Sequence, residues 1–218
     1  AYNDVDGAEG EPAASLTANA FGVRTLGRAA GEIGASFVHY STDFVFDGRA
    51  SRPYSEEDAP NPLGVYASSK LIGEWFALEV PRALVLRVES LFGGRPAKSS
   101  IDRIVEAIAS GREAKVFVDR TVSPSYVDDV AAATRVLIER GRSGLYHCVA
   151  TGHCTWYELA QEIARLMGKA HEARLVPVPV ASVQLRAPRP VFAALANDKL
   201  RSVLPVPSWQ DALRRYLT

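Results

Sequence analysis

The positions of apolar residues predict an alternation of helices and buried strands along the chain. A period of about 3.6 residues in the segment 15–34 predicts a helix, carried by Leu16, Ala20, Val23, Leu26, Ala30 and Ile33. Short apolar, β-prone runs at 37–42 and 83–88 predict two buried strands. Further helices are predicted at 65–78, 100–110, 128–140 and 155–167, and further strands at 115–119 and 144–150.

This order of elements predicts an α/β fold, because helices alternating with fully apolar strands are typical of a parallel sheet. Residues 1–14 are polar and acidic and are expected to form a loop, and residues 43–64 form a long connection. The tail beyond about residue 170 is rich in Pro, Val and Arg, with short helices expected near 197–204 and 208–217.

The composition and the net charge of the chain limit the kinds of molecule that it is expected to bind. The chain has 218 residues, with 25 basic and 25 acidic side chains, so no global positive field favours nucleic acid. No apolar run approaches the roughly 18 residues that span a bilayer, and two cysteines do not make a disulfide framework. We therefore expect a cytoplasmic protein that binds neither nucleic acid nor a membrane.

Candidate catalytic chemistry is concentrated between residues 38 and 70. The strand at 37–42 delivers Thr42 and Asp43 at its carboxyl end, where ligands bind in open α/β sheets. Tyr66 and Lys70 are one helical turn apart, so both side chains leave the same helix face. An ammonium beside a phenol is expected to lower the tyrosine pKa, which suits proton transfer near neutral pH. We interpret Thr42, Tyr66 and Lys70 as a carbonyl-reducing site.

Several motifs have simpler explanations. A Tyr-x-x-x-Lys spacing alone also fits an amphipathic surface pair, so the signal depends on its context. Two His-Cys pairs, His147-Cys148 and His153-Cys154, lack a standard zinc spacing, and no metal site is predicted. Trp156, which opens a helix, is interpreted as a core anchor and not as a ligand platform.

Three segments resemble the extended short-chain dehydrogenase/reductases, and within them the dTDP-4-dehydrorhamnose reductase family. They are Ser41-Thr42-Asp43-Phe44-Val45-Phe46-Asp47-Gly48, Pro53-Tyr54-Ser55-Glu56-Glu57-Asp58, and Pro62-Leu63-Gly64-Val65-Tyr66-Ala67-Ser68-Ser69-Lys70. The resemblance implies a Rossmann-like, doubly wound parallel sheet with a small C-terminal α/β substrate-binding lobe. Residues 1–125 would belong to the dinucleotide-binding domain, and residues 126–218 mostly to the lobe.

The resemblance also implies an activity, which is reduction of a 4-keto-6-deoxy nucleotide sugar with NADPH or NADH. The implied catalytic residues are Thr42, Tyr66 and Lys70, with Tyr66 as the proton donor to the C4 oxygen. The implied cofactor contacts are Ala1, Tyr2, Asn3, Tyr66 and Lys70, and the implied substrate contacts are Thr42, Asp43, Ser90 and Arg189. A homodimer is the assembly that the resemblance suggests.

The sequence departs from the family pattern at several positions. It has no Gly-x-x-Gly-x-x-Gly segment to hold a pyrophosphate, and we expect the first four strands of the family fold to be absent from the chain. Ser90 stands where the family usually has a Trp, and Phe44 where it often has a Tyr. Two alternatives therefore stay open: a related nucleotide-sugar epimerase or dehydratase, and a non-catalytic regulatory subunit like that of methionine adenosyltransferase. Phe44 argues against a dehydratase, because dehydratases typically carry a Glu after the Thr-Asp pair.

Overall fold

A three-stranded parallel sheet lies at the centre of the computed structural model, which describes residues 1–218. Its order is β1 (Phe37–Thr42), β2 (Ala83–Val88) and β7 (Gly144–His147), with Thr42 paired to Val88 and Arg87 to His147. All three carboxyl ends therefore meet at one edge of the sheet. The predicted strands 37–42 and 83–88 are confirmed.

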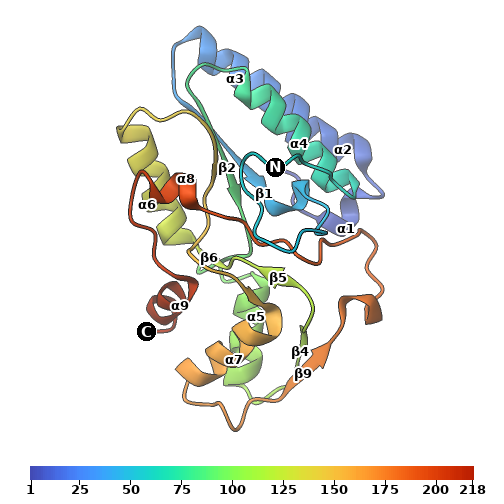
Figure 1. Ribbon diagram of the computed structural model, residues 1–218. Coiled ribbons are helices and arrows are strands. Elements are labelled where there is room, and N and C mark those ends of the chain that lie inside the picture. Colours follow the sequence, from blue (N-terminus) through green and yellow to red (C-terminus); the bar gives the residue numbers. More distant parts are fainter.

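Helices cover both faces of this sheet, on either side of β1 and β2 in Figure 1. Alternate residues of β2 explain the arrangement, because successive side chains of a strand point to opposite faces. Leu84 and Leu86 pack against α6 (Val127–Glu139) and α8 (Asp198–Arg201). Val85 packs against α3 (Gly22–Glu32) and α4 (Val65–Leu78). This is the predicted doubly wound α/β arrangement, and it explains why β2 is buried on both faces.

A second group of elements lies below the sheet in Figure 1. This group has its own core of 16 buried residues, which is enclosed by the helices α5 (Ser100–Ala109), α7 (Trp156–Leu166) and α9 (Trp209–Leu217). The strand β4 (Ala114–Phe117) pairs in parallel with β9 (Leu175–Val178) at the rim. The core combines residues from before and after position 125, and the predicted domain boundary there stays a prediction.

Two short strand pairs and an isolated bridge connect the remaining segments. The strand β3 (Leu91–Phe92) runs parallel to β6 (Ser125–Tyr126), and β5 (Thr121–Val122) runs antiparallel to β8 (Cys154–Thr155). The bridge between Tyr54 and Leu195 joins the long connection after β1 to the C-terminal tail. These pairings bring the loops around the carboxyl edge of the sheet into contact with the lower group. None of the helices combines the length and the apolar character needed to cross a membrane.

The N-terminal segment differs from its prediction. Residues 1–14 are not one loop: they contain α1 (Val5–Ala8), capped by Asp4, and the start of α2 (Pro12–Leu16). A π turn at Thr17–Phe21 joins α2 to α3. Because a π turn inserts an extra residue, it rotates the helix face that follows. Leu26 and Ile33, predicted to face inward, are consequently 63% and 81% exposed.

The tail also contains an element that the pattern did not predict. The strand β9 carries Pro177 and is flanked by Pro179, and prolines are uncommon in strands except at edges. By contrast, the N-terminus of α7 follows its prediction: the Thr155 hydroxyl accepts a hydrogen bond from the Glu158 N–H, and the Glu158 carboxylate accepts one from the Thr155 N–H. This capping box fixes the start of α7, and with it the position of Trp156.

Candidate active site

The carboxyl end of β1 forms the first wall of the site. A short 3-10 turn, Asp43–Val45, ends the strand and buries both Thr42 and Asp43. The Thr42 hydroxyl donates a hydrogen bond of 2.9 Å to Asp43 Oδ1 and accepts one of 3.3 Å from the Phe44 N–H. The turn therefore fixes the orientation of the Thr42 hydroxyl.

The helix α4 places Tyr66 and Lys70 against this turn. Thr42 lies close enough to Tyr66 to lower its pKa, and the Tyr66 ring meets the Phe44 ring edge-on, with centroids 5.8 Å apart. Lys70 is buried, and its Nζ donates a hydrogen bond of 2.5 Å to the Tyr40 carbonyl. The structure thus brings Thr42, Tyr66 and Lys70 together, as the sequence predicts.

The electrostatics of this trio differ from the expectation. Burial raises the pKa of Tyr66 to about 12, the charge of Asp43 adds to the rise, and only the Thr42 hydrogen bond opposes it. Burial lowers the pKa of Lys70 to about 8, against the influence of Glu74. The predicted lowering of the tyrosine pKa is therefore wrong for this structure. The physical reason is desolvation of the phenol, while the Lys70 ammonium hydrogen-bonds the Tyr40 carbonyl.

A buried carboxyl cluster lies behind Thr42. Asp43 faces the Arg120 guanidinium at 3.9 Å, yet burial raises the Asp43 pKa to about 6. Glu89, directly after β2, is also buried and accepts a hydrogen bond of 2.7 Å from the Ser123 N–H. Burial and the charge of Asp43 raise the Glu89 pKa well above its ordinary value. Sequence reasoning missed Glu89 and Arg120; the available signal was an acidic residue directly after a buried strand.

The predicted substrate contacts Ser90 and Arg189 both border this region. Ser90 follows Glu89 with a φ of 44°, in the left-handed region. Arg189 forms an ion pair of 2.8 Å with Asp6 and lies over the Phe44 ring, 5.6 Å from its centroid. Because the same ring contacts Tyr66, Arg189 is brought to the site from a distant part of the chain.

The N-terminal residues connect to the helix that carries Tyr66 and Lys70. The Asn19 side chain accepts a hydrogen bond of 2.8 Å from the Tyr2 N–H and donates bonds of 3.0 Å to the Tyr2 carbonyl and to Ser69 Oγ. Ser69 directly precedes Lys70. Tyr2 is therefore fixed beside α4, while Ala1 and Asn3 on either side of it are exposed.

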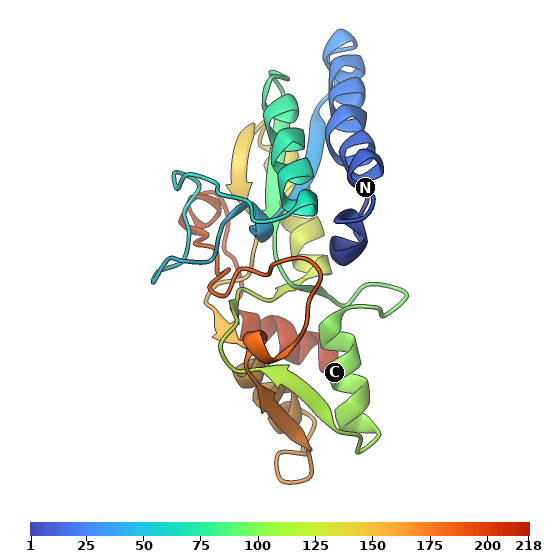
Figure 2. The same ribbon diagram turned by 90° about the vertical axis from the view of Figure 1, so that its right-hand side faces the viewer.

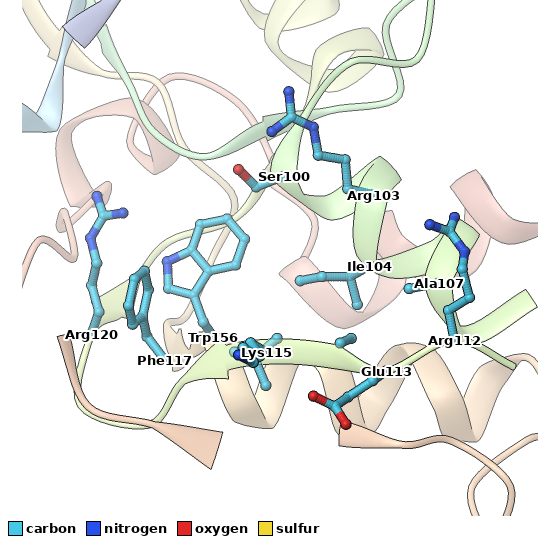
Figure 3. A pocket seen from close by; sticks show the side chains of 12 residues that line it. Ser100, Arg103, Ile104, Ala107, Arg112, Glu113, Lys115, Phe117, Arg120 and Trp156 are labelled. Atoms are coloured by element: carbon cyan, nitrogen blue, oxygen red, sulfur yellow. The ribbon is translucent and has the colours of Figure 1, made fainter. Parts of the chain in front are cut away.

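A basic cavity of about 370 Å³ lies between α5 and β4 (Figure 3). Its charged lining is Arg103, Arg112, Glu113, Lys115 and Arg120, and the Phe117 and Trp156 rings form one wall. Arg120 joins the cavity to Asp43. Trp156 belongs to the core, as predicted, but it also faces this cavity, which sequence reasoning did not find. The lining residues come from three elements, so no single motif reveals them.

The two cysteines and His147 lie in the interior. Cys148 and Cys154 are buried free thiols. The His147 ring contacts the Ala196 carbonyl through Nδ1 at 3.1 Å and Arg87 through Nε2 at 3.3 Å. Both ring nitrogens of His147 thus have protein partners.

The fold and the site together define an α/β protein with the Tyr-Lys helix of short-chain reductases beside a parallel sheet. The family model described as "RmlD substrate binding domain" matches residues 1–218. The chain belongs to this family, that of dTDP-4-dehydrorhamnose reductase. It is similar to the dTDP-4-dehydrorhamnose reductase of Mycobacterium tuberculosis strain CDC 1551, with 36% identity over 98% of this chain and 72% of the relative. It is also similar to the dTDP-4-dehydrorhamnose reductase of Escherichia coli K12, with 33% identity over 100% of this chain and 76% of that relative.

Solved structures show the same fold. The structure of dTDP-4-dehydrorhamnose reductase from Bacillus anthracis in complex with NADP aligns with a TM-score of 0.93 and 31% identity, covering 100% of this chain and 77% of that one. The Rossmann-like architecture expected from the resemblance is thereby confirmed.

Proposed function

We propose that this protein is an NAD(P)H-dependent reductase that converts the C4 ketone of a 4-keto-6-deoxy nucleotide sugar to an alcohol. The observation that carries the proposal is the convergence of Thr42, Tyr66 and Lys70 at the carboxyl end of β1. Membership of the dTDP-4-dehydrorhamnose reductase family supports the substrate class. The NADP bound to the Bacillus anthracis relative supports the cofactor class.

Tyr66 is the proton donor in this proposal. With its pKa raised to about 12, the phenol is fully protonated at neutral pH and is suited to donation and not to abstraction. The ketone oxygen becomes an alkoxide as hydride arrives, and an alkoxide is a stronger base than a phenolate. Transfer of the Tyr66 proton is therefore favourable at that moment. The Thr42 hydroxyl, turned from Asp43 Oδ1 toward the substrate, would donate a hydrogen bond to the same oxygen and orient it.

The residues around Lys70 fit a nicotinamide riboside. An ammonium has three donors, and Lys70 uses one of them on the Tyr40 carbonyl, so two remain for the hydroxyls of a ribose. Tyr66 and Lys70 would hold the ribose, and Ala1, Tyr2 and Asn3 would line the cofactor next to α4. When bound, the reduced nicotinamide supplies the hydride to C4.

The basic cavity fits the nucleotide portion of the substrate. Arginine side chains bind phosphate through paired, charge-assisted hydrogen bonds, and Arg103, Arg112 and Arg120 all line the cavity. The Phe117 and Trp156 rings offer flat surfaces for a base. Arg120 would then lie between the diphosphate and the sugar. Asp43, Ser90 and Arg189 would contact the sugar itself.

A spectrophotometric assay tests the proposal. Full-length protein is mixed with NADPH and dTDP-4-keto-6-deoxyhexose, and the nicotinamide absorbance is followed as it is oxidised. Tyr66→Phe is expected to lower turnover at least 100-fold, because the proton donor is lost. Tyr157→Phe, on a different helix, is the matched control and keeps its activity. Tight NADPH binding without turnover would instead favour a regulatory subunit.

A further inference from the structure

The register of β1 and β2 places Asp43 and Glu89 next to each other. They directly follow Thr42 and Val88, which are paired residues of β1 and β2. Adjacent strands lie about 4.8 Å apart, so the two carboxyl side chains emerge side by side at the carboxyl edge. Asp43 is 3% exposed and Glu89 is 2% exposed.

The hydrogen bonds of the two carboxyls are incomplete. Asp43 Oδ1 accepts from the Thr42 hydroxyl, and one Glu89 oxygen accepts from the Ser123 N–H. Asp43 Oδ2 and Glu89 Oε1 are buried and accept no hydrogen bond, although Arg120 faces Asp43 Oδ2 at 3.9 Å. Buried carboxyl oxygens are normally hydrogen-bonded, and one added proton on the pair would give these two oxygens such a bond.

The charges around the pair do not balance. Arg120 is the cation that acts on both carboxyls, and it lies 3.9 Å from Asp43. Arg189 is already paired with Asp6 at 2.8 Å, and the other titratable groups facing the cluster, Tyr66 and Cys154, are neutral acids. Two buried carboxylates opposite one arginine would leave an uncompensated negative charge, which is costly in the interior. The raised pKa values of Asp43 and Glu89 agree with this excess of negative charge.

We infer that Asp43 and Glu89 share one proton. After each turnover this proton reprotonates Tyr66 by way of the Thr42 hydroxyl. The Thr42 hydroxyl donates a hydrogen bond to Asp43 Oδ1, and Thr42 lies close enough to Tyr66 to lower its pKa. A rotation of this hydroxyl would link the two groups. Asp43 and Glu89 are positioning and proton-storage residues in this account. The inference rests on the proposed function, in which Tyr66 loses its proton to the substrate.

The proton balance of the relay closes. In the reduction, the Tyr66 O–H bond breaks and the new O–H bond forms on the substrate. The Thr42 hydroxyl, which donates to Asp43 Oδ1 at rest, then turns to the Tyr66 phenolate and gives it its proton, while the Thr42 oxygen takes the proton of the Asp43 carboxyl. The pair is left with two carboxylates and regains its proton from solvent, by way of the cavity that Arg120 lines. No oxidant or reductant beyond the nicotinamide is needed.

An infrared titration measures the shared proton directly. Wild-type protein at pH 7 is expected to show the C=O stretch of a protonated carboxyl, and Glu89→Gln is expected to remove it. In that variant Asp43 faces Arg120 alone and becomes an ordinary carboxylate. Glu139→Gln on the surface of α6 is the control and leaves the band unchanged. Absence of the band in the wild-type protein overturns the inference, and this arm does not depend on the folding of any variant.

Kinetics separate the relay from a structural role. In Glu89→Gln the first turnover is expected to keep its wild-type rate, because Tyr66 still carries its proton, while steady-state turnover at pH 8 falls about tenfold. Equal slowing of both phases would overturn the relay. A wild-type protein that shows the infrared band but oxidises no NADPH would refute the proposed function and, with it, the relay, while leaving the shared proton established.

Discussion

Glu74 of α4 and Arg87 of β2 are joined by two hydrogen bonds of 2.7 and 2.8 Å, and each side chain is only 2% exposed. The Arg87 guanidinium also lies over the Phe46 ring, 4.9 Å from its centroid. Burial, together with the Arg87 charge, lowers the pKa of the adjacent His147 to about 3, so that imidazole is neutral. Because Glu74 lies one helical turn after Lys70, the ion pair fixes the Tyr66–Lys70 helix to the sheet.

Removing one partner of this pair is expected to be costly. Glu74→Ala leaves Arg87 buried without its carboxylate and should lower the free energy of unfolding by about 3–5 kcal/mol. Glu139→Ala removes an exposed partner of Arg135 and should cost no more than about 1 kcal/mol. Urea denaturation at pH 7 measures both. Equal losses in the two variants would show that the buried pair does not hold α4 in place.

Gly73 allows α4 to approach the π turn closely. A Cβ at this position would lie 2.2 Å from the Asn19 carbonyl oxygen, so Gly73→Ala forces the two backbones apart and should cost about 1–3 kcal/mol. Gly31→Ala is the matched control, since its Cβ would lie 4.0 Å from the nearest atom, a methyl carbon of Val80. That variant should gain about 0.5 kcal/mol from helix propensity. Thermal unfolding compares them, and a neutral Gly73→Ala would refute the close contact.

The buried Lys70 makes stability depend on pH in a defined window. Its pKa is about 8 in the folded protein and near 10.5 when exposed, so the unfolded state binds more protons between these values. Stability therefore rises with pH from about 8 to 10 through this group. In Lys70→Met this rise of stability with pH disappears, whereas substitution of an exposed lysine, Lys98→Met, leaves it unchanged. Urea midpoints at pH 7, 8, 9 and 10 test the difference; parallel curves for wild type and Lys70→Met would contradict it.

The basic cavity predicts how the nucleotide is bound. Arg103→Ala should weaken the affinity for dTDP about tenfold, because one charge-assisted hydrogen bond to phosphate is lost. Arg142→Ala, at an exposed position after α6, should leave the affinity unchanged. Isothermal titration calorimetry in low and high salt measures both, and the affinity of the wild type should fall with salt. An unchanged affinity in Arg103→Ala would place the diphosphate elsewhere.

Local patterns were sufficient for the elements that carry the catalytic trio. The mainly apolar sequence of β2 reflects burial on both sheet faces, and the bounds of α4 follow from helical periodicity. The structure has both elements at the predicted residues. The face of α3 could not be predicted, because the π turn at Thr17–Phe21 leaves no signature in the apolar pattern. It rotates Leu26 and Ile33 into solvent.

The rest of the site depends on contacts between distant segments. Asp43 meets Arg120 and Phe44 meets Arg189 only after the chain has folded. Figure 2 shows the C-terminal tail passing between the sheet and the lower group, and this path brings Arg189 to Phe44. The pKa of Tyr66 was mispredicted for a related reason, since the burial of its ring is a property of the assembled site. The sequence identifies the reacting groups, but their protonation states require the structure.

Isotope transfer is the sharpest test of hydride transfer to C4 with Tyr66 as the proton donor. The full-length protein is incubated with dTDP-4-keto-6-deoxyhexose and NADPH carrying deuterium at the transferable position, and the sugar product is analysed by NMR. The account predicts one deuterium on C4 of the product for wild type and Tyr157→Phe, and little product for Tyr66→Phe. Product without deuterium on C4, or full deuterium transfer by Tyr66→Phe, would contradict it.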